Sequence, residues 1–490
     1  MEQFLHDVQS QTIDLSVLDT MSSFANIPYY FYYENKTDTA DFMTSDMLRN
    51  SFYVALLDFP ILAGHLVMDG AGHATIVVDR DNLNLPEYRE SQSRVHFSEL
   101  VASKFSWHSL PDGVATAGPL TAAGPDGTIK LANIHVVRML DNSGVIVFAN
   151  IVHYVVDGAG YCQFINRWAE VGKWMHGGSA TGELPAFAAS FARNTILEHL
   201  PNDRKSLDRL TKELCTTSGP LSKWLAWISP ELRGRVLNMV VSMTSTEGHV
   251  FYISPSAMAS LRRLVQGNVH DGMRLSDNDI LTALISMVVA QGDTGKASTA
   301  AGGGFLAALG AYLLPSMFAP AKEFVTEVLL DSRPRLQGMC SAGYTGNVIF
   351  VRCLASSMET LCGNIDGQSL ALVARNLRNM VNDTDAPFIG QLIDTLSKDP
   401  SCFMCPKAHD ITNAMVAVSN QSRFTLYDTD FGGGIPVWVS PIAASFANFV
   451  TVIPVHPAMG GYAVYMTTTK RAMENVLRNE FWMKSVELLY

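Results

Sequence analysis

The clearest pattern of hydrophobic and polar positions in this chain lies between residues 144 and 174. Gly144–Val152 is an unbroken apolar run rich in β-branched residues, which predicts a buried strand. From Tyr161 to Trp174 apolar residues recur at helical spacing, which predicts a helix. The residues between them are expected to form a strand-to-helix turn, where side chains reach into a cleft while the scaffold holds them in place.

The remainder of the chain also alternates between strand-like and helix-like segments. We expect strands at residues 74–78, 131–139 and 249–253, and helices at residues 42–57, 255–265 and 280–289. Ser254 suits the N-cap of the helix at 255–265, and Pro255 suits its first position. Because both halves alternate in this way, the sequence predicts an α/β chain with two domains of similar size.

A break in this alternation separates the two halves. Residues 186–245 mix polar helical stretches with Pro201, Pro220 and Pro230, which is typical of a long crossover. We therefore expect an N-terminal half at residues 1–185, a crossover linker at 186–245 and a C-terminal half at 246–490.

The turn after residue 152 holds the candidate chemistry. A neutral imidazole such as that of His153 can take a proton from an alcohol or an amine near pH 7. Asp157 could orient the turn by pairing with a buried arginine or by capping the next helix. Gly158 places no side chain beside the histidine, which leaves room for a substrate. A core histidine at a strand end would fit this short motif as well, so the decision depends on other segments.

Composition and charge narrow the class of protein. Hydrophobic residues make up 48% of the 490 residues and charged residues 17%, which indicates a globular protein with large cores. The net charge of −11 argues against nucleic-acid binding as the main task, because phosphate contacts need clustered lysine and arginine. No segment has the length and apolar character of a transmembrane helix, and the N-terminus does not resemble a signal peptide, so we expect a cytoplasmic protein.

The cysteines suggest reduced thiols. Seven is an odd number for a disulfide framework, and several of the seven lie in apolar segments. Cys402 and Cys405 have the spacing of a redox or zinc pair, with His409 nearby, but no second pair completes a zinc site. We therefore expect no metal site.

Five segments, in the same order along the chain, resemble motifs of the BAHD acyltransferases, which move an acyl group from coenzyme A (CoA). The segments are Asp14-Leu-Ser-Val-Leu-Asp19, Phe59-Pro-Ile-Leu-Ala-Gly-His-Leu66, His153 to Gly158, Asp331-Ser-Arg-Pro-Arg-Leu336 with Gly343-Tyr-Thr-Gly-Asn347, and Asp430-Phe-Gly-Gly-Gly434. The likeness spans almost the whole chain. One departure is Gly433, which stands where the family usually has tryptophan.

This resemblance implies a fold and an arrangement of the site. It implies two chloramphenicol-acetyltransferase-like domains, each a mixed β-sheet flanked by helices, with a channel between them and His153 midway. Asp157 is then structural and pairs with an arginine, for which Arg333 is the first candidate and Arg335 the second. Asp430 and the glycines around it are likewise structural; the expected structural residues of the site are Asp157, Gly158, Arg333, Asp430, Gly432 and Gly434.

The resemblance also implies a reaction. We expect His153 to act as general base in direct transfer of an acyl group, with acetyl the commonest in the family, from acyl-CoA to a hydroxyl or amine of a specialised metabolite. Neither a covalent intermediate nor a permanently bound cofactor is needed, and the protein is expected to be a monomer. Asn347 and Thr429 are candidate oxyanion or channel residues.

Two other functions remain open at this stage. A condensation-type enzyme would take its acyl group from a carrier-protein thioester, but such domains usually have a second histidine where this chain has Val152. A non-catalytic binding protein on the same scaffold is the other alternative; Gly433 favours it slightly, whereas the intact His153 and Asp157 argue against it. The identity of the acceptor depends on loops that the sequence does not resolve.

Overall fold

The computed structural model places most of the chain. It describes residues 1–490 except 22–24, 70–72, 119–120, 122, 125–126, 178–182, 194–209, 211–213, 217–245, 270–271, 294–322, 337–339, 342, 399–401, 405–413 and 443–446. Cys405 and His409 lie outside the described residues, as does most of the predicted linker.

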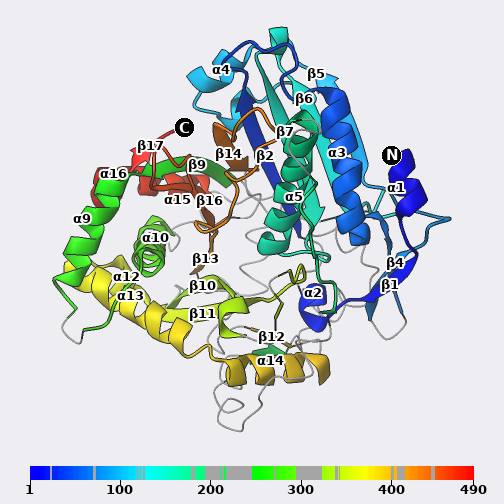
Figure 1. Ribbon diagram of the computed structural model, residues 1–490. Helices are drawn as coiled ribbons and strands as arrows, with labels where there is room; N and C mark the ends of the chain where they lie inside the picture. The colour runs from blue at the N-terminus through cyan, green and yellow to red at the C-terminus, as the bar shows by residue number, and fades with distance from the viewer. Residues whose placement is uncertain are drawn as a thin grey trace, which may run out of the picture.

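The first sheet has five strands and carries the turn at residue 153. Its order is β14 (Trp438–Pro441), β2 (Asn26–Glu34), β7 (Gly144–Val152), β6 (Ala132–Arg138) and β5 (Glu87–Gln92). All neighbours pair antiparallel except β5 and β6, which are parallel. All nine residues of the central strand β7 are buried, as its continuous apolar run predicted. Helices α3 (Ser45–Asp58) and α5 (Gly158–Gly177) pack together on one face of this sheet (Figure 1).

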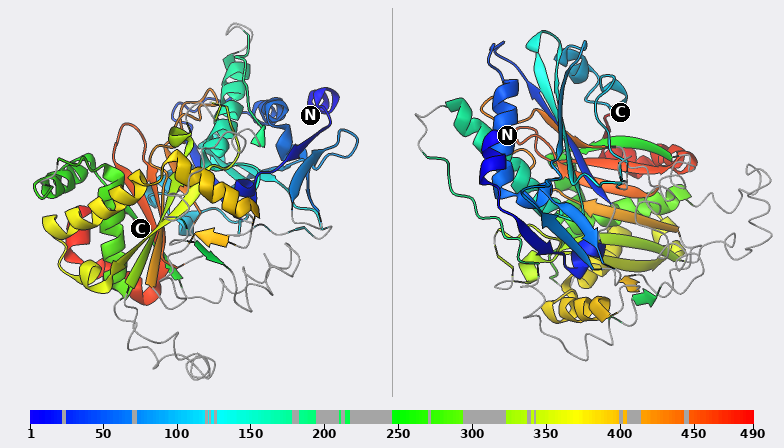
Figure 2. Two further views of the ribbon diagram at one scale, coloured as in Figure 1. Left: turned by 90° about the horizontal axis from the view of Figure 1, so that it is seen from below. Right: turned by 90° about the vertical axis from the view of Figure 1, so that its right-hand side faces the viewer.

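The second sheet has seven strands of mixed direction. Its order is β11 (Ile349–Ser357), β10 (Glu323–Asp331), β13 (Ala414–Asn420), β15 (Phe449–Pro454), β16 (Tyr462–Thr469), β9 (Thr246–Ile253) and β17 (Glu487–Leu488). One hydrophobic core joins this sheet to α9 (Pro255–Gln266), α10 (Asp277–Asp293), α13 (Gly367–Asn382) and α15 (Lys470–Arg478). In the left view of Figure 2 these helices lie apart from α3 and α5.

Smaller elements complete the described part. A three-stranded sheet has the order β1 (Gln11–Asp14), β4 (Ala74–Val78) and β3 (His65–Met68), and β12 (Cys402–Met404) pairs with β8 (Leu214–Thr216). The other α-helices are α1 (Glu2–Asp7), α2 (Val17–Met21), α4 (Phe97–Ala102), α12 (Met358–Cys362), α14 (Ala386–Lys398) and α16 (Glu480–Ser485). The 3-10 helices are η1 (Pro60–Ala63), η2 (Trp107–Ser109), η3 (Leu140–Asn142) and η8 (Arg333–Arg335).

The predicted elements occur with small shifts at their ends. Strands β4 and β7 have the predicted bounds, and the predicted helix at 42–57 is α3. The Ser254 hydroxyl caps α9 by accepting the Ala257 amide, with Pro255 in the first turn. Helix α5 starts three residues before the predicted Tyr161, because the Asp157 side chain accepts the amides of Ala159 and Gly160 and so caps the helix.

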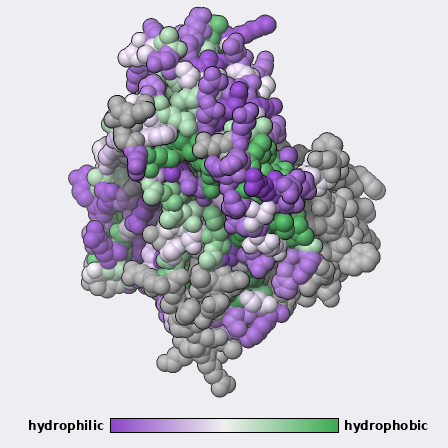
Figure 3. Space-filling view, turned by 45° about the vertical axis from the view of Figure 1, so that its right-hand side comes forward, coloured by the Kyte–Doolittle hydropathy of each residue, from purple (hydrophilic) through white to green (hydrophobic). Residues whose placement is uncertain are grey.

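The two halves of the sequence are interleaved at one point. Strand β14 belongs to the second half of the chain, yet it pairs with β2 at the edge of the first sheet. The boundaries expected at residues 185 and 245 remain a prediction, since most of residues 194–245 lie outside the described part. Within that part, no helix has both the length and the apolar character needed to cross a membrane. On the face in Figure 3, hydrophobic surface gathers across the middle of the molecule, below a mostly hydrophilic upper part.

Candidate active site

The turn between β7 and α5 places His153 at the end of the central strand of the first sheet. The backbone amide of His153 donates to the Ala25 carbonyl at 2.9 Å, which continues the pairing between β7 and β2 by one residue. The histidine is partly exposed, whereas its neighbours Val152 and Tyr154 are buried. The site histidine therefore sits at a strand end and is not fully enclosed.

The side chain of Asn347 fixes which nitrogen of the imidazole carries the proton. The Asn347 side-chain amide donates to the His153 carbonyl at 2.8 Å and to the Asp19 carboxylate at 2.9 Å. Both partners only accept hydrogen bonds, so the amide oxygen must face the other way, where it lies 2.8 Å from His153 Nδ1. An oxygen accepts, so Nδ1 carries the proton. The other ring nitrogen, Nε2, is then an unprotonated acceptor, as a general base requires.

The surroundings of His153 keep the ring neutral. Burial lowers the pKa of His153 below its ordinary value of 6.5, because a charged imidazolium is poorly solvated there. The nearby carboxylate of Asp157 opposes this shift, and the shift remains downward. At neutral pH the imidazole therefore has its base form.

Asp157 forms a buried ion pair with Arg333. The two guanidinium nitrogens of Arg333 donate to the two carboxylate oxygens at 2.8 and 2.9 Å. Asp157 is 0% exposed and also accepts the amide of Val348. Burial on its own would lower the pKa of Arg333, but the Asp157 carboxylate raises it above the ordinary arginine value. The Asp157–Arg333 ion pair connects the histidine turn to the segment that follows β10. Asp157 therefore has two structural roles, because it caps α5 and also pairs with an arginine.

Gly158 allows close packing of neighbouring segments and does not leave space for a substrate. A Cβ at Gly158 would lie 2.2 Å from the ring of Phe424, and one at Gly160 would lie 2.2 Å from the Thr345 carbonyl. The expectation that Gly158 leaves room for a substrate is therefore wrong, because Phe424 fills that space. The start of α5 packs closely against segments from the second half of the chain.

The glycine motif after Asp430 forms a tight turn. One oxygen of Asp430 accepts the amides of Gly432 and Gly434, and the other lies 2.7 Å from the Lys173 ammonium. Both glycines have φ values near +100°, which favour glycine. The structure thus assembles the motif residues into a turn that is linked to α5.

The presence of glycine at position 433 is explained by the residues that pack next to it. A Cβ at this position would lie 2.7 Å from Phe42 and 3.3 Å from Met43. Phe42 is buried, and Met43 has a positive φ of 44°. The segment before α3 therefore occupies the space next to residue 433, where a larger side chain would otherwise project.

Three further candidates have positions different from those expected. Both side-chain amide contacts of Asn347 go to Asp19 and His153, so Asn347 holds the histidine ring and does not offer a donor to an oxyanion. The Thr429 hydroxyl is buried, donating to the Leu426 carbonyl and lying 3.0 Å from the Tyr33 hydroxyl. Arg335 is not a partner of Asp157, since it donates to the carbonyls of Asp331 and Val381.

A large cavity opens between the two parts of the molecule next to the histidine turn. Its volume is about 1500 Å³, which exceeds the range of about 300–1000 Å³ typical of small-molecule sites. The first part contributes the start of α5, including Cys162, and the second part contributes η8 and the ends of β13 and α13. His153 is not among the residues that line this cavity, whereas Arg333, the partner of Asp157, is.

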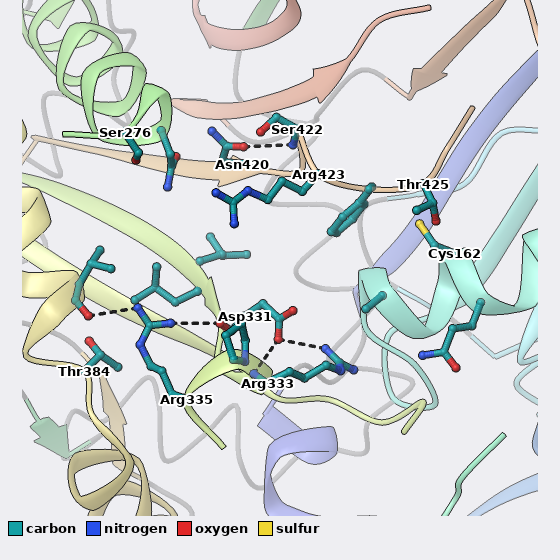
Figure 4. A pocket seen from close by; sticks show the side chains of 18 of the residues that line it. Cys162, Ser276, Asp331, Arg333, Arg335, Thr384, Asn420, Ser422, Arg423 and Thr425 are labelled. Carbon is teal, nitrogen blue, oxygen red and sulfur yellow. Dashed lines mark hydrogen bonds and ion pairs between the residues drawn. The ribbon is translucent and has the colours of Figure 1, made fainter. Parts of the chain in front are cut away.

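Five arginines and four carboxylates line this cavity, which leaves a small excess of positive charge on its wall. In Figure 4, Arg423 reaches into the cavity from the loop after β13, and Arg335 lies on the opposite side. In the part of the chain that the structure describes, neither has a carboxylate partner. Burial, and the like charge of Arg378, lower the pKa of Arg335. Arginines without a carboxylate partner are suited to a ligand that carries negative charge.

Two site residues were not identified from the sequence. Asp19 lies within the quoted Asp14–Asp19 motif, and only the structure shows its carboxylate bound to Asn347. Arg193 lies in a segment without helical or strand periodicity, and it reaches the histidine turn by donating to the Val155 carbonyl at 2.7 Å. A buried arginine in an irregular segment has no pattern by which the sequence could have singled it out.

Comparisons with known proteins agree with this architecture. The Transferase family matches residues 6–213 and 317–481 of the chain. A hydroxycinnamoyltransferase of Narcissus pseudonarcissus is 19% identical over 486 residues, covering 98% of this chain and 95% of that protein. F. graminearum TRI101, solved with coenzyme A and deoxynivalenol, matches with a TM-score of 0.72 at 15% identity over 98% of this chain and all of that one. Vinorine synthase matches with a TM-score of 0.61 at 14% identity over 95% of this chain and 92% of that one. The structural likeness confirms the predicted fold.

Proposed function

Because the chain belongs to the Transferase family, that of the BAHD acyltransferases, we propose that it moves an acyl group from acyl-CoA to a hydroxyl or amine of a small molecule. Coenzyme A is bound in the TRI101 structure, together with a small molecule. Acyl-CoA is accordingly a co-substrate in this proposal, with no permanently bound cofactor. The observation that carries the proposal is the partly exposed His153, whose Nδ1–H donates to Asn347 and leaves Nε2 free as a base.

The reaction proceeds by direct transfer. Nε2 of His153 takes the proton from the acceptor hydroxyl or amine as its oxygen or nitrogen attacks the thioester carbonyl. The resulting tetrahedral oxyanion collapses, the carbon–sulfur bond breaks, and the protonated His153 returns its proton to the CoA thiolate. The ester or amide and free CoA are the products, and the histidine ends in the state in which it began.

A covalent acyl-enzyme is not part of this proposal. The thiol on the cavity wall nearest to the histidine turn in sequence is Cys162, and burial raises its pKa to about 12. A nucleophilic cysteine needs a lowered pKa, because the thiolate is the reactive form. Cys162 therefore stays protonated at neutral pH, which supports a single step between the two bound substrates.

The cavity suits the proposed co-substrate in size and charge. CoA carries several phosphate charges, and arginine is the side chain best adapted to phosphate. Arg335 and Arg423, which have no carboxylate partner among the described residues, line the cavity and are available for such a ligand. The volume of about 1500 Å³ is large enough for part of a CoA molecule. Acetyl is our first candidate for the acyl group, and the protein is proposed to act as a monomer.

The experiment that tests the proposal is a screen of donors and acceptors. The purified chain is incubated with acetyl-, longer aliphatic and aromatic acyl-CoAs and with panels of hydroxylated and amine acceptors, and products are detected by mass spectrometry. We expect an acylated acceptor and an equal amount of free CoA for at least one pair. Transfer from a carrier-protein thioester but from no acyl-CoA would instead identify a condensation-type enzyme. Absence of transfer from both kinds of donor, with the protein folded, would favour a binding protein.

A further inference from the structure

A line of buried polar groups leads away from the histidine ring into the protein. His153 Nδ1 lies 2.8 Å from the Asn347 side chain, which donates to Asp19 at 2.9 Å. The Arg193 Nε lies 3.6 Å from the other oxygen of Asp19, and both side chains are 0% exposed. These four residues come from the turn after β7, the segment before β11, α2 and the segment after α5.

Asp19 needs its charge for the hydrogen bonds that it accepts. One oxygen accepts the backbone amide and the side-chain amide of Asn347, and the other accepts the backbone amide and the hydroxyl of Ser16. A protonated carboxyl would have to give up one of these bonds in order to donate. A buried carboxylate, however, is costly without a nearby cation. Arg193 supplies that cation, since Arg333 pairs with Asp157 and Asp331.

The charge on Asp19 and the His153 carbonyl together orient the Asn347 amide. A charged carboxylate accepts and never donates, so the amide nitrogen must face Asp19 and the amide oxygen must face His153. Without that charge, the His153 carbonyl alone would oppose rotation of the amide by half a turn. After such a rotation the amide nitrogen would donate to Nδ1, and the proton would move to Nε2, where a base is required to be bare. The charge of Asp19 therefore strengthens the preference of His153 for the Nδ1–H tautomer.

Arg193 also holds the histidine turn directly. One terminal nitrogen donates to the Val155 carbonyl at 2.7 Å, inside the turn between His153 and Asp157. The other donates to the Thr345 hydroxyl at 3.2 Å, two residues before Asn347. The guanidinium carbon lies 5.4 Å from the ring centre of Tyr344. Arg193 therefore contacts the segments that carry the histidine and its asparagine partner, as well as Asp19.

We propose that Arg193 is a positioning residue for the transfer reaction, which balances the buried carboxylate of Asp19 and thereby helps to hold His153 in the tautomer with a bare Nε2. The proposal rests on His153 acting as the base of the proposed function. Arg333 fixes the position of the turn through Asp157, and Arg193 supports the protonation pattern of the ring. The two arginines have separate tasks, although both contact the same turn.

The test reads the tautomer without any turnover. The protein is labelled with ¹⁵N-histidine, and the ring nitrogens of His153 are assigned by comparison with His153→Gln. In the unmodified protein we expect the proton on Nδ1. Arg193→Met leaves Asp19 buried without a cation and could prevent folding, so the double variant Asp19→Asn/Arg193→Met, which removes both charges together, is measured beside it. In the double variant we expect the Nε2–H tautomer to appear and kcat to fall by about tenfold or more, with KM for acyl-CoA little changed.

A matched control separates this effect from loss of a buried arginine in general. Arg352 is also buried and donates to a threonine, Thr384, but it packs on Phe388 away from the histidine turn. Arg352→Lys should leave the His153 tautomer unchanged. Retention of pure Nδ1–H in a folded double variant would overturn the proposal, and so would an equal tautomer change in the control. Because the tautomer is read in the resting protein, this result is independent of whether the donor screen finds an acyl-CoA.

Discussion

At the scale of single residues, the site depends on the direction of one hydrogen bond. His153 carries its proton on Nδ1 because its partner there is the oxygen of Asn347, and Asn347 is turned that way by acceptors on its other side. The sequence identified His153 and Asp157 from their spacing in a strand-to-helix turn, and it proposed Arg333 as the partner of Asp157. It could not give the orientation of an amide, because that depends on a carboxylate 328 positions away in the chain.

The pH dependence of the reaction follows from the burial of His153. Burial lowers the pKa of the ring below 6.5, and in the proposed mechanism the base form is the active one. We expect kcat/KM to be constant at neutral pH and to fall as the pH is lowered, with a midpoint below 6.5. Initial rates from pH 4.5 to 8 at low substrate would measure this profile. An acid limb with its midpoint well above 6.5 would contradict the assignment of this imidazole as the base.

The Asp157–Arg333 ion pair is expected to contribute to the free energy of unfolding. Arg333→Met would leave the buried Asp157 without its cation, and breaking a buried pair from one side costs about 3–5 kcal/mol. The midpoint of urea unfolding should fall accordingly. Lys173→Met is the matched control, because Lys173 is 62% exposed in its pair with Asp430 and exposed pairs contribute about 0–1 kcal/mol. Equal losses in the two variants would refute the view that the Asp157 pair organises the turn.

At the scale of elements, the glycine turn and the segment before α3 fit each other. The family usually has tryptophan at the position of Gly433, but here Phe42 and Met43 occupy the neighbouring space. The sequence showed that the tryptophan was absent and could not show what replaced it, since Phe42 lies almost 400 residues earlier. Strand and helix periodicity predicted β7, α3, α5 and α9 well, because each buries a face that its own residues define.

The close approach of residue 433 to Phe42 predicts that substitutions at these two positions compensate for each other. Gly433→Trp should destabilise the protein by about 1–3 kcal/mol, since its Cβ would lie 2.7 Å from the Phe42 ring. Phe42→Ala opens that space and should on its own be destabilising through the cavity that it leaves. We expect the double variant to be more stable than the sum of the two single losses allows, which thermal unfolding of all four proteins would measure. Simple additivity would show that the two residues do not share one space.

At the scale of the whole molecule, segments distant in sequence build the site together. The histidine comes from the first sheet, Arg333 and Asn347 from the edge of the second, and Asp19 and Arg193 from segments outside both sheets. Strand β14 adds a further connection, since it carries residues of the second half into the first sheet. The α/β class and the motif order could be predicted from the sequence, whereas the size of the cavity and the place of Arg423 on its wall required the structure.

The proposal that His153 is the base is tested most directly by measuring the turnover of His153→Ala with the donor and acceptor pair that the screen identifies. Its CoA affinity by calorimetry and its thermal unfolding midpoint are measured on the same preparation. We predict that kcat falls by about 100-fold or more while CoA binding and the unfolding midpoint stay close to those of the unmodified protein. Turnover by His153→Ala at the unmodified rate would contradict the claim that this imidazole is the base.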